Sequence, residues 1–384
     1  MKKNETDNVV IVFEPASDVH WMKDVVQLPN AFAQKLYNKN AILIARPNHS
    51  QIEIGRHIQI ELFGKHLNEN DAFFKKSDYS KIVTDPQWYI NACKKAATLG
   101  AVLILYPFYG NAYKGARQFK ITRWLKGRKA IVIIKSDGTL LERSAQKVSV
   151  KQQFKDRLLY FFFDKIICEN QKIYEDMLIN NPHLNSKLVF IPNCPLDIYH
   201  GKKIPYTEKA NKFLFVGRVD DKEKGADILL NTWLKIANQL PNWKLEIAGP
   251  CSKEYQERWE EKFIDNRIMD SVIWSGPAGP KELVTKYNHA KIVVCSSRKE
   301  SGPIVLSEAI LSGCAFIGTE VGEIPFLLKG LEGIIDSEND MGEVMLKFAR
   351  NESLGEEQSK RLLLKMKDRT WGKQVEKIKI KRIK

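Results

Sequence analysis

Short runs of apolar residues, many of them β-branched, alternate along the chain with longer amphipathic segments. Runs of four or five such residues are typical of strands that are covered on both faces of a parallel sheet. The segments 226–239 and 280–290, which lie between runs, have the apolar periodicity of helices. Alternation of strands and helices on this scale predicts an α/β fold. The predicted strands are Val9–Phe13, Ala41–Ala45, Ala101–Leu105, Ala130–Ile134, Lys165–Cys168, Leu188–Ile191, Phe213–Val216, Lys244–Ala248, Ser271–Trp274, Lys291–Cys295 and Ala315–Gly318.

The length of 384 residues and one break in this pattern predict two domains. The stretch 192–211 contains Pro192, Pro195, Gly201 and Pro205 but no apolar period, so we expect the boundary there. The predicted architecture is two doubly wound, Rossmann-like domains, residues 1–200 and 206–365, facing a central cleft. The basic segment 366–384 is expected to be a helix that packs back on the first domain, or else a solvated end.

Composition places the chain among ordinary globular proteins, because 43% hydrophobic and 28% charged residues exclude a disordered or fibrous protein. No stretch approaches the ~18 consecutive apolar residues of a membrane-spanning helix, and the polar beginning of the chain lacks the pattern of a signal peptide. The six cysteines are scattered and form no CxxC pair, which predicts buried thiols in a reducing compartment rather than disulfides or a zinc site. We therefore expect a soluble, cytoplasmic protein.

Ligands of doubly wound sheets bind beyond the carboxyl ends of the strands, so the loops that follow strands are the places to search for chemistry. The loop after Phe213–Val216 contains Gly217, Arg218 and Lys224. Gly217 allows a ligand to approach the backbone closely, and the two cations suit a pyrophosphate. A surface loop with ordinary solvated charges would have the same composition, so this loop is suggestive only in combination with others.

A second loop follows Lys291–Cys295 and leads into a helix. We expect Ser301 to cap this helix, Pro303 to lie in its first turn and Gly313 to end it. The backbone N–H groups around Gly302 and Ile304 would then form an anion site at the helix N-terminus.

Two glutamates flank this predicted anion site. Glu300 precedes the site. Glu308 lies only ~8 Å along the helix from Pro303, at a rise of ~1.5 Å per residue. Because carboxylates repel phosphates, they make sense here as acceptors for hydroxyl groups, one for a sugar and the other for a ribose. Two glutamates at this spacing also arise by chance on surfaces, so the interpretation depends on the strand, loop and helix around them.

At this point the sequence resembles a known family. VGR with Lys224-Gly225, the Glu300-x7-Glu308 spacing, the following SGCAFIGTEVGEIP and Ile191-Pro192-Asn193 together resemble the retaining glycosyltransferases of family 4, also called glycosyl transferases group 1. The resemblance covers residues 206–350 well and the first domain only in its general layout. It implies the two-domain GT-B fold, in which the second domain binds a nucleotide-sugar and the first binds the acceptor.

The resemblance also implies roles for particular residues. Arg218 and Lys224 would neutralise the departing diphosphate, Glu300 would hold hydroxyls of the donor sugar, and Glu308 would hold the ribose. The reaction would need neither a metal ion nor a cofactor, and the substrate would be a UDP- or GDP-sugar. The remaining residues implied in donor binding are Gly217, Ser301, Gly302, Pro303 and Ile304, together with Ser275, Gly276 and Pro277 in the loop that frames the base.

The acceptor side departs from the family pattern. EPASDVHWMKDV follows the first strand where many relatives have a glycine pair, and Lys135-Ser136-Asp137-Gly138 follows AIVII where many have a histidine. Asp137 or His20 is therefore expected to assist the acceptor, and Lys23 and Asp24 are expected to lie on the same side. Since the first domain offers no obvious carboxylate nucleophile, we expect front-face substitution, in which the acceptor attacks from the side of the leaving group.

Other function classes are compatible with parts of this sequence. A nucleotide-sugar epimerase or a phosphorylase could have the same two-sheet architecture, and product analysis would separate them from a transferase. A dinucleotide oxidoreductase is disfavoured because neither VFEPAS nor VGRVDD contains GxGxxG. The formal charge of +15 would suit a nucleic-acid-binding protein, but the basic residues follow no recognised nucleic-acid-binding motif.

The surplus positive charge is concentrated in the segment 111–129, which contains no acidic residue and several interleaved aromatic and aliphatic side chains. Lys114, Arg117, Lys120 and Arg123 recur at every third position, so we expect them to share one helical face. Such a face suits an anionic membrane surface that holds a lipid-linked acceptor. It suits a phosphorylated soluble acceptor as well. The expected role is a cytoplasmic transferase of cell-surface polysaccharide biosynthesis, peripheral on the inner face of the membrane, with a glycan or lipid-linked acceptor.

Overall fold

The computed structural model describes residues 8–13, 22–46, 57–65, 86–106, 111–136, 157–158, 160–337 and 339–380. The chain divides into two compact units. Unit 1 comprises Met1–Pro192 and Trp371–Lys384, and unit 2 comprises Asn193–Thr370. The chain thus enters unit 2 at the start of the predicted linker and returns to unit 1 near its end.

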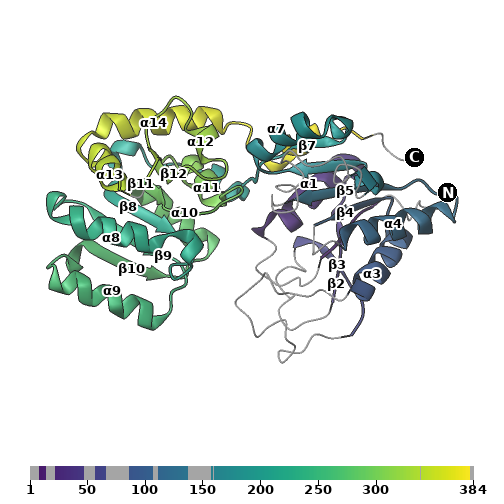
Figure 1. Ribbon diagram of the computed structural model, residues 1–384, viewed down its shortest axis with the longest axis horizontal. Coiled ribbons are helices and arrows are strands. Elements are labelled where there is room, and N and C mark those ends of the chain that lie inside the picture. Colours follow the sequence, from purple (N-terminus) through teal and green to yellow (C-terminus); the bar gives the residue numbers. More distant parts are fainter. Residues whose placement is uncertain are drawn as a thin grey trace. The chain divides into compact units, whose positions relative to one another are not determined.

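Unit 1 is built on a parallel sheet with the strand order β3-β2-β1-β4-β5-β6-β7. Sequential strands run outward in both directions from β1, which is the doubly wound arrangement. α3 and α4 pack together beside this sheet (Figure 1). The strands are β1 (Val9–Val12), β2 (Ile42–Ala45), β3 (Gln59–Leu62), β4 (Val102–Leu105), β5 (Ile131–Ser136), β6 (Lys165–Cys168) and β7 (Leu188–Phe190); the helices are α1 (Asp24–Tyr37), α3 (Pro86–Leu99), α4 (Ala112–Trp124), α7 (Gln171–Asn180) and α15 (Trp371–Gln374), with 3-10 turns η3 (Tyr160–Phe162), η4 (Pro182–Leu184) and η10 (Val375–Lys377).

Unit 2 repeats this plan with the strand order β10-β9-β8-β11-β12-β13, again all parallel. The strands are β8 (Ala210–Val216), β9 (Lys244–Ala248), β10 (Val272–Gly276), β11 (Ala290–Cys295), β12 (Ala315–Thr319) and β13 (Ile334–Ile335); the helices are α8 (Ala226–Ile236), α9 (Lys253–Asp265), α10 (Pro280–His289), α11 (Ile304–Leu311), α12 (Ile324–Leu327), α13 (Met341–Arg350) and α14 (Glu352–Lys365), with 3-10 turns η5 (Asp197–His200), η6 (Tyr206–Glu208), η7 (Lys222–Lys224), η8 (Ala237–Gln239) and η9 (Met269–Ser271).

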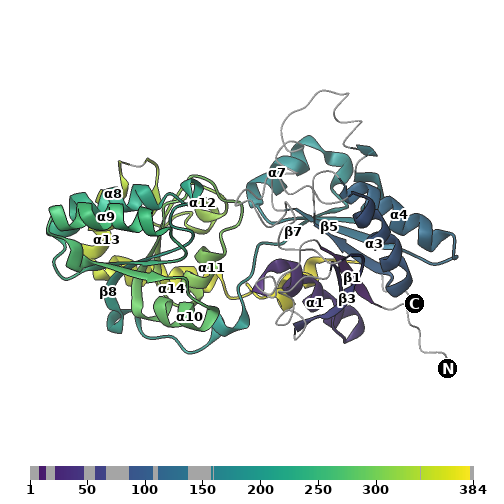
Figure 2. The same cartoon turned by 90° about the horizontal axis from the view of Figure 1, so that it is seen from below.

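Both faces of the second sheet are covered by helices, as the apolar runs predict. Phe213 and Phe215 of β8 pack with side chains of α8, α9 and α13, whereas Leu214 between them packs with α10, α11 and α14. Figure 2 shows α8 and α9 on one side of this unit and α10 and α14 on the other. Successive strand residues point to opposite faces, so a strand buried on both sides must be apolar throughout. The predicted α/β class with two doubly wound domains is confirmed.

The final described segment, 371–380, packs in unit 1. The ammonium of Lys35 on α1 donates to the carbonyl of Val375 at 3.0 Å, and Val375 and Ile378 are buried. The end of the chain therefore contributes to the core of the unit in which the chain begins. No helix in the described part of the chain is long and apolar enough to cross a membrane.

Candidate functional site

The centre of the candidate site lies where the loops after β8 and β11 meet. These strands are neighbours in the sheet, so the loops at their carboxyl ends are adjacent. Lys224 Nζ lies 2.7 Å from Glu300 Oε1, and the Ser297 hydroxyl donates to the same oxygen at 2.8 Å. The structure thus brings together the predicted cation and the predicted sugar-binding carboxylate.

Local backbone geometry explains why Lys224 reaches this position. The Asp221 side chain accepts from the N–H of Glu223 and so caps η7. Gly225 then adopts a left-handed conformation with φ of +64°, and a Cβ there would lie 2.0 Å from the carbonyl oxygen of Ser296. Only glycine allows the two loops to approach this closely. The sequence Lys224-Gly225 therefore places the lysine directly beside the loop that carries Glu300.

Arg218 lies at the start of the same loop and is more exposed. Its side chain is 48% exposed, and its guanidinium forms an ion pair of 2.5 Å with Asp221. The neighbouring Gly217 is fixed by a backbone hydrogen bond to Ala248 of β9 at 3.0 Å. Two cations, one half-exposed and one partly buried, thus border the carboxyl end of β8.

The start of α11 differs from the prediction. The helix begins at Ile304 with Pro303 as its N-cap, so Ser301 lies two residues before the cap and does not cap the helix. Proline fits here because its backbone nitrogen has no proton that would need a partner. The N–H groups of the first turn, beginning with Ile304, follow directly after Gly302 and Pro303. The anion site expected at this end stays a prediction.

The other end of α11 is as expected. Gly313 has a φ of +75°, its N–H donates to Ile310, and the next N–H, of Cys314, donates to Ala309. This pair of bonds is the Schellman motif that commonly ends a helix at glycine. The prediction that Gly313 ends the helix is confirmed.

Glu308 is held by two tyrosines. Tyr287 on α10 donates to Glu308 Oε2 at 2.9 Å, and Tyr199 in η5 donates to the same carboxylate. Burial raises the pKa of Glu308 to about 7, although both hydroxyl groups act in the opposite direction. This carboxylate therefore changes its charge near neutral pH.

Ser275 and Gly276 were expected in a loop but are the last two residues of β10, and this end of the strand is anchored by a charge cluster. The Ser275 hydroxyl donates to Glu246 Oε1 at 2.7 Å, and Lys212 and Lys286 pair with the same carboxylate. Burial alone would raise the pKa of Glu246, but these three donors hold it at about 2. The Ser275 side chain is thus occupied by Glu246, while Gly276 turns the chain at a φ of +63° and is followed by the exposed Pro277.

Sequence reasoning missed Arg298. Its guanidinium forms two parallel bonds with the Asp227 carboxylate, at 2.7 and 2.8 Å, and a third to the carbonyl of Lys222. This residue ties the loop after β11 to the loop after β8. Arg298 could have been identified in the same way as Arg218, because both are cations in a loop that directly follows a predicted strand.

On the acceptor side, the structure describes two of the four predicted residues. Asp24 is the first residue of α1, and its carboxylate lies 2.6 Å from the ammonium of Lys135 at the end of β5. Lys23 is exposed and lies at the N-cap position of α1. His20 and Asp137 lie outside the described residues.

Lys135 is itself unexpected, because its side chain is only 1% exposed and also pairs with Glu169 after β6. Burial alone would lower the pKa of this lysine, but the two carboxylates outweigh burial and raise it. The hydroxyl of Tyr106 after β4 donates to the backbone carbonyl of Asp24 at 2.9 Å. The cluster therefore gathers residues from the carboxyl ends of β4, β5 and β6.

The expected basic face of α4 is only partly formed. Arg117 is exposed, and Lys114 and Lys120 are partly exposed, with Lys120 paired to Asp164 at 2.9 Å. Arg123 was expected on this face but is buried, and its guanidinium donates to the carbonyls of Ala97, Gly100 and Lys129. The free carbonyls at the end of α3 attract this cation into the interior.

Comparison with known proteins gives a consistent result. Residues 200–361 match the family described as Glycosyl transferases group 1. The 41.2 kDa protein in the cps region of Klebsiella pneumoniae is 32% identical over 139 residues, which is 36% of this chain and 36% of that protein. The D-inositol 3-phosphate glycosyltransferase of Corynebacterium aurimucosum is 26% identical over 191 residues, covering 41% and 44% of the two chains. The matches therefore span less than half the length of these curated relatives.

The fold comparison covers both units. HepE of Anabaena, solved with UDP and glucose, superposes with a TM-score of 0.66 over 97% of this chain and 99% of that one, at 12% identity. Such low identity supports the fold and no more. The expected GT-B architecture is confirmed, and the predicted family is confirmed at the level of group 1. Residues 200–361, most of unit 2, are therefore similar to the family described as Glycosyl transferases group 1.

Proposed function

We propose that the protein is a retaining glycosyltransferase that moves a sugar from a UDP- or GDP-sugar to a glycan or lipid-linked acceptor in cell-surface polysaccharide biosynthesis. The observation that carries this proposal is the Lys224–Glu300 pair at the carboxyl edge of the second sheet, beside the N-terminus of α11. A cation, helix N–H groups and a carboxylate in one place suit a diphosphate joined to a polyol. The cps-region location of the Klebsiella pneumoniae relative supports the polysaccharide context.

In the proposed reaction, the departing diphosphate is stabilised by Lys224, Arg218 and the first turn of α11. An ammonium has three N–H donors, and the pair with Glu300 occupies one direction, so Lys224 can contact a phosphate while it holds the carboxylate in place. Glu300 accepts hydroxyls of the donor sugar and Glu308 those of the ribose. The diphosphate leaves, and the acceptor attacks the same face of the sugar, so that the departing phosphate receives the acceptor's proton.

Metal independence is part of the proposal, because protein cations and backbone dipoles provide positive charge where the leaving group would develop negative charge. In the described part of the chain, no group of three or more His, Cys, Asp or Glu side chains is arranged to hold a metal ion. Addition of a chelator to the transfer assay tests this proposal directly.

The main test combines a donor screen with one substitution. The purified protein is incubated with UDP- and GDP-sugars and slow hydrolysis is followed, then repeated with Glu300→Gln. We expect hydrolysis of one class of donor, and its loss in the variant with an unchanged melting curve, since an amide cannot replace a charge-assisted bond to donor hydroxyls. Near-native turnover by Glu300→Gln with unchanged melting would contradict the assignment of the site.

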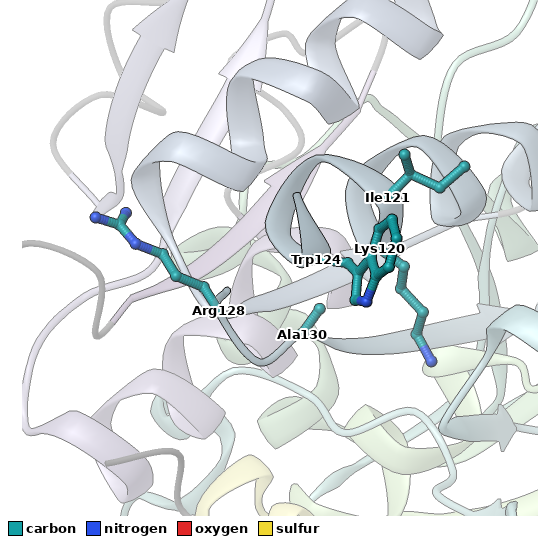
Figure 3. A pocket seen from close by; sticks show the side chains of 5 residues that line it. All are labelled: Lys120, Ile121, Trp124, Arg128 and Ala130. Atoms are coloured by element: carbon teal, nitrogen blue, oxygen red, sulfur yellow. The ribbon is translucent and has the colours of Figure 1, made fainter. Parts of the chain in front are cut away.

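We further propose that α4 and the turn after it rest on an anionic membrane that presents a lipid-linked acceptor. Trp124 and Leu125 are 75% and 71% exposed, and Lys120 and Arg128 border the same shallow pocket as Trp124 (Figure 3). An exposed indole beside cations is typical of residues at a membrane interface. Arg123 makes no part of this surface because it is buried.

Co-sedimentation with liposomes tests the membrane proposal. We expect binding to anionic vesicles at low salt, little binding to neutral vesicles, and weaker binding when Lys114, Arg117 and Lys120 become Ser. A matched control replaces three exposed lysines of unit 2, Lys235, Lys253 and Lys281, by Ser. No binding to anionic vesicles at low salt would contradict the proposal and favour a soluble phosphorylated acceptor.

A further inference from the structure

The segment 193–200, which leads the chain into unit 2, reaches the candidate donor site at two points. The side-chain amide of Asn193 donates to the carbonyl of Gly302 at 3.1 Å. Tyr199 in η5 donates to the carboxylate of Glu308, and η5 packs against α10 and α11. One short stretch of chain therefore contacts two residues, Gly302 and Glu308, of the motif that runs from Glu300 to Glu308.

Tyr199 and Tyr287 together fix Glu308. Tyr287 donates to Oε2 at 2.9 Å, and the two rings pack edge to face with their centroids 5.9 Å apart. Both tyrosines are buried, at 3% and 0% exposed, so neither can turn away from the carboxylate without disturbing the core. A carboxylate has about four lone-pair directions, and two hydroxyl donors leave the others free for a ribose.

In the described part of the chain, no cation bonds to the Glu308 carboxylate. The ammonium of Lys209 donates instead to the backbone carbonyls of Tyr287 and Ser312, both at 3.0 Å. The titratable groups that face Glu308 are Tyr287 from α10 and Tyr199 from η5, and its own helix, Ile304–Leu311, carries no other titratable side chain. Cys314 lies beyond Tyr287, where its thiol donates to the Tyr287 carbonyl at 3.0 Å. The two hydroxyls are thus the groups that favour the ionised form of Glu308 against its burial.

Asn193 acts at the other end of the motif. A backbone carbonyl directed at a diphosphate would repel it, because both carry negative charge on oxygen. By accepting from Asn193, the Gly302 carbonyl has a partner within the protein. The following residues, Pro303 and Ile304, begin α11, so the orientation of this peptide also sets the direction of the helix N–H groups.

We propose that the segment 193–200 is a component of the donor site, in which Tyr199, together with Tyr287, aims Glu308 at the ribose and Asn193 orients the Gly302 carbonyl away from the diphosphate. Tyr199, Tyr287 and Asn193 are positioning residues: they act through Glu308 and Gly302 and do not contact the reacting atoms. This inference rests on the proposed function, since it takes the donor roles of Glu308 and Gly302 from it.

The test is calorimetric binding of UDP and GDP to the full chain, at several pH values on both sides of 7. Wild type is compared with Tyr199→Phe, Tyr287→Phe and Asn193→Ala. Tyr206→Phe is the matched control, because Tyr206 is a buried tyrosine of the same unit that lies against Gly355 instead of Glu308. The melting temperature of each variant is measured alongside, so that a folding defect is not mistaken for a binding defect.

For wild type, we expect nucleotide affinity to rise as the pH passes through about 7, where Glu308 ionises. Each Phe variant at 199 or 287 should move this midpoint to higher pH and weaken binding near pH 7 about tenfold or more, the effect of one lost hydrogen bond to a charged group. Asn193→Ala should weaken binding without moving the midpoint, because Asn193 does not touch Glu308. Tyr206→Phe should bind as wild type does.

Two failures are distinguishable. If wild type binds neither UDP nor GDP, the proposed function is wrong and the inference falls with it. If wild type binds a nucleotide but both Phe variants keep its affinity and its pH midpoint, the donor site stands and the positioning roles are wrong.

Discussion

Both sheets are doubly wound and have a lysine at the carboxyl edge, but the two lysines differ in their number of carboxylate partners and in their exposure to solvent. In unit 2, Lys224 pairs with the single carboxylate of Glu300 and remains 28% exposed. In unit 1, Lys135 is enclosed between Asp24 and Glu169 and is 1% exposed. A lysine with one partner and access to solvent can still receive an anion, whereas a lysine enclosed by two carboxylates leaves the cluster with a net negative charge.

The difference shows that the topology of a sheet determines which edge can bind a ligand. The net charge at that edge is determined by side chains from separate loops. A net negative edge in unit 1 suits the hydroxyls of a glycan better than a phosphate. Within the proposed function, this favours an acceptor whose reacting end is neutral.

Replacing Lys135 by Met should lower the free energy of unfolding of unit 1 by about 3–5 kcal/mol, because the buried carboxylate of Glu169 and the partly exposed one of Asp24 lose their common partner. The equivalent change, Lys224→Met, should cost less than about 1 kcal/mol, since that pair is partly solvated. Urea denaturation measures both. Adding Glu169→Gln to Lys135→Met should recover part of the loss. Equal losses from the two lysine variants would remove the contrast between the edges.

Although Lys224→Met should have little effect on stability, we expect it to have a large effect on activity. Lys224→Met should reduce the rate of donor hydrolysis on the order of 10²–10³-fold, as loss of one preorganised donor to a developing charge does. Arg218→Met should have a smaller effect, because this guanidinium is 48% exposed and already shared with Asp221. Turnover at saturating donor distinguishes the two. A larger loss from Arg218→Met would assign the main phosphate contact to Arg218.

Glu308 gives a prediction for stability against pH. Its pKa of about 7 in the folded protein exceeds the ordinary value of 4.5, so between these two pH values the folded state binds a proton that the unfolded state has lost. The contribution of Glu308 to the free energy of unfolding therefore declines as the pH rises toward 7. Glu308→Gln should therefore raise the free energy of unfolding by about 1–2 kcal/mol at alkaline pH, while it weakens nucleotide binding.

Glu246 is the internal control for that experiment. Its pKa of about 2 lies below the ordinary value, so its contribution is complete above pH 4.5 and is lost only as the pH falls toward 2. Glu246→Gln should destabilise the protein at neutral pH, the reverse of Glu308→Gln. The same sign of change for both variants at alkaline pH would contradict the assigned direction of one of the two pKa shifts.

The smallest expected effect is that of a chelator. EDTA should leave transfer unchanged, because Lys224, Arg218 and the first turn of α11 are proposed to carry the charge role of a metal. The measurement is product formation with and without EDTA, followed by addition of Mn²⁺ or Mg²⁺. Complete loss that a metal ion restores would overturn the proposed metal independence.

Much of the fold could be predicted from the sequence, since each predicted apolar run corresponds to a strand. In the described part of the chain, the two strands that were missed are edge strands. Gln59–Leu62 is largely exposed and polar at alternate positions, and Ile334–Ile335 has only two residues. An edge strand is covered on fewer sides, so it does not need the continuous apolar run by which central strands are identified.

The candidate site was predictable where it depends on adjacent loops of neighbouring strands, as for Lys224 and Glu300. The position of a side chain was not predictable where its partner lies far away in the sequence. Spacing placed Arg123 on an outer face of α4, but the carbonyls at the end of α3 bind it inside. Likewise, Lys135 has partners from two other segments that no local pattern connects to it.

The return of segment 371–380 to unit 1 has a consequence for the order of folding. All of unit 2 is inserted between two pieces of unit 1. During synthesis from the N-terminus, the inserted unit emerges complete while its host still lacks Val375 and Ile378, two buried residues near the end. The second unit can therefore finish folding first, and a ribosome that stalls within the last turns should release a chain in which unit 2 is folded and unit 1 is incomplete.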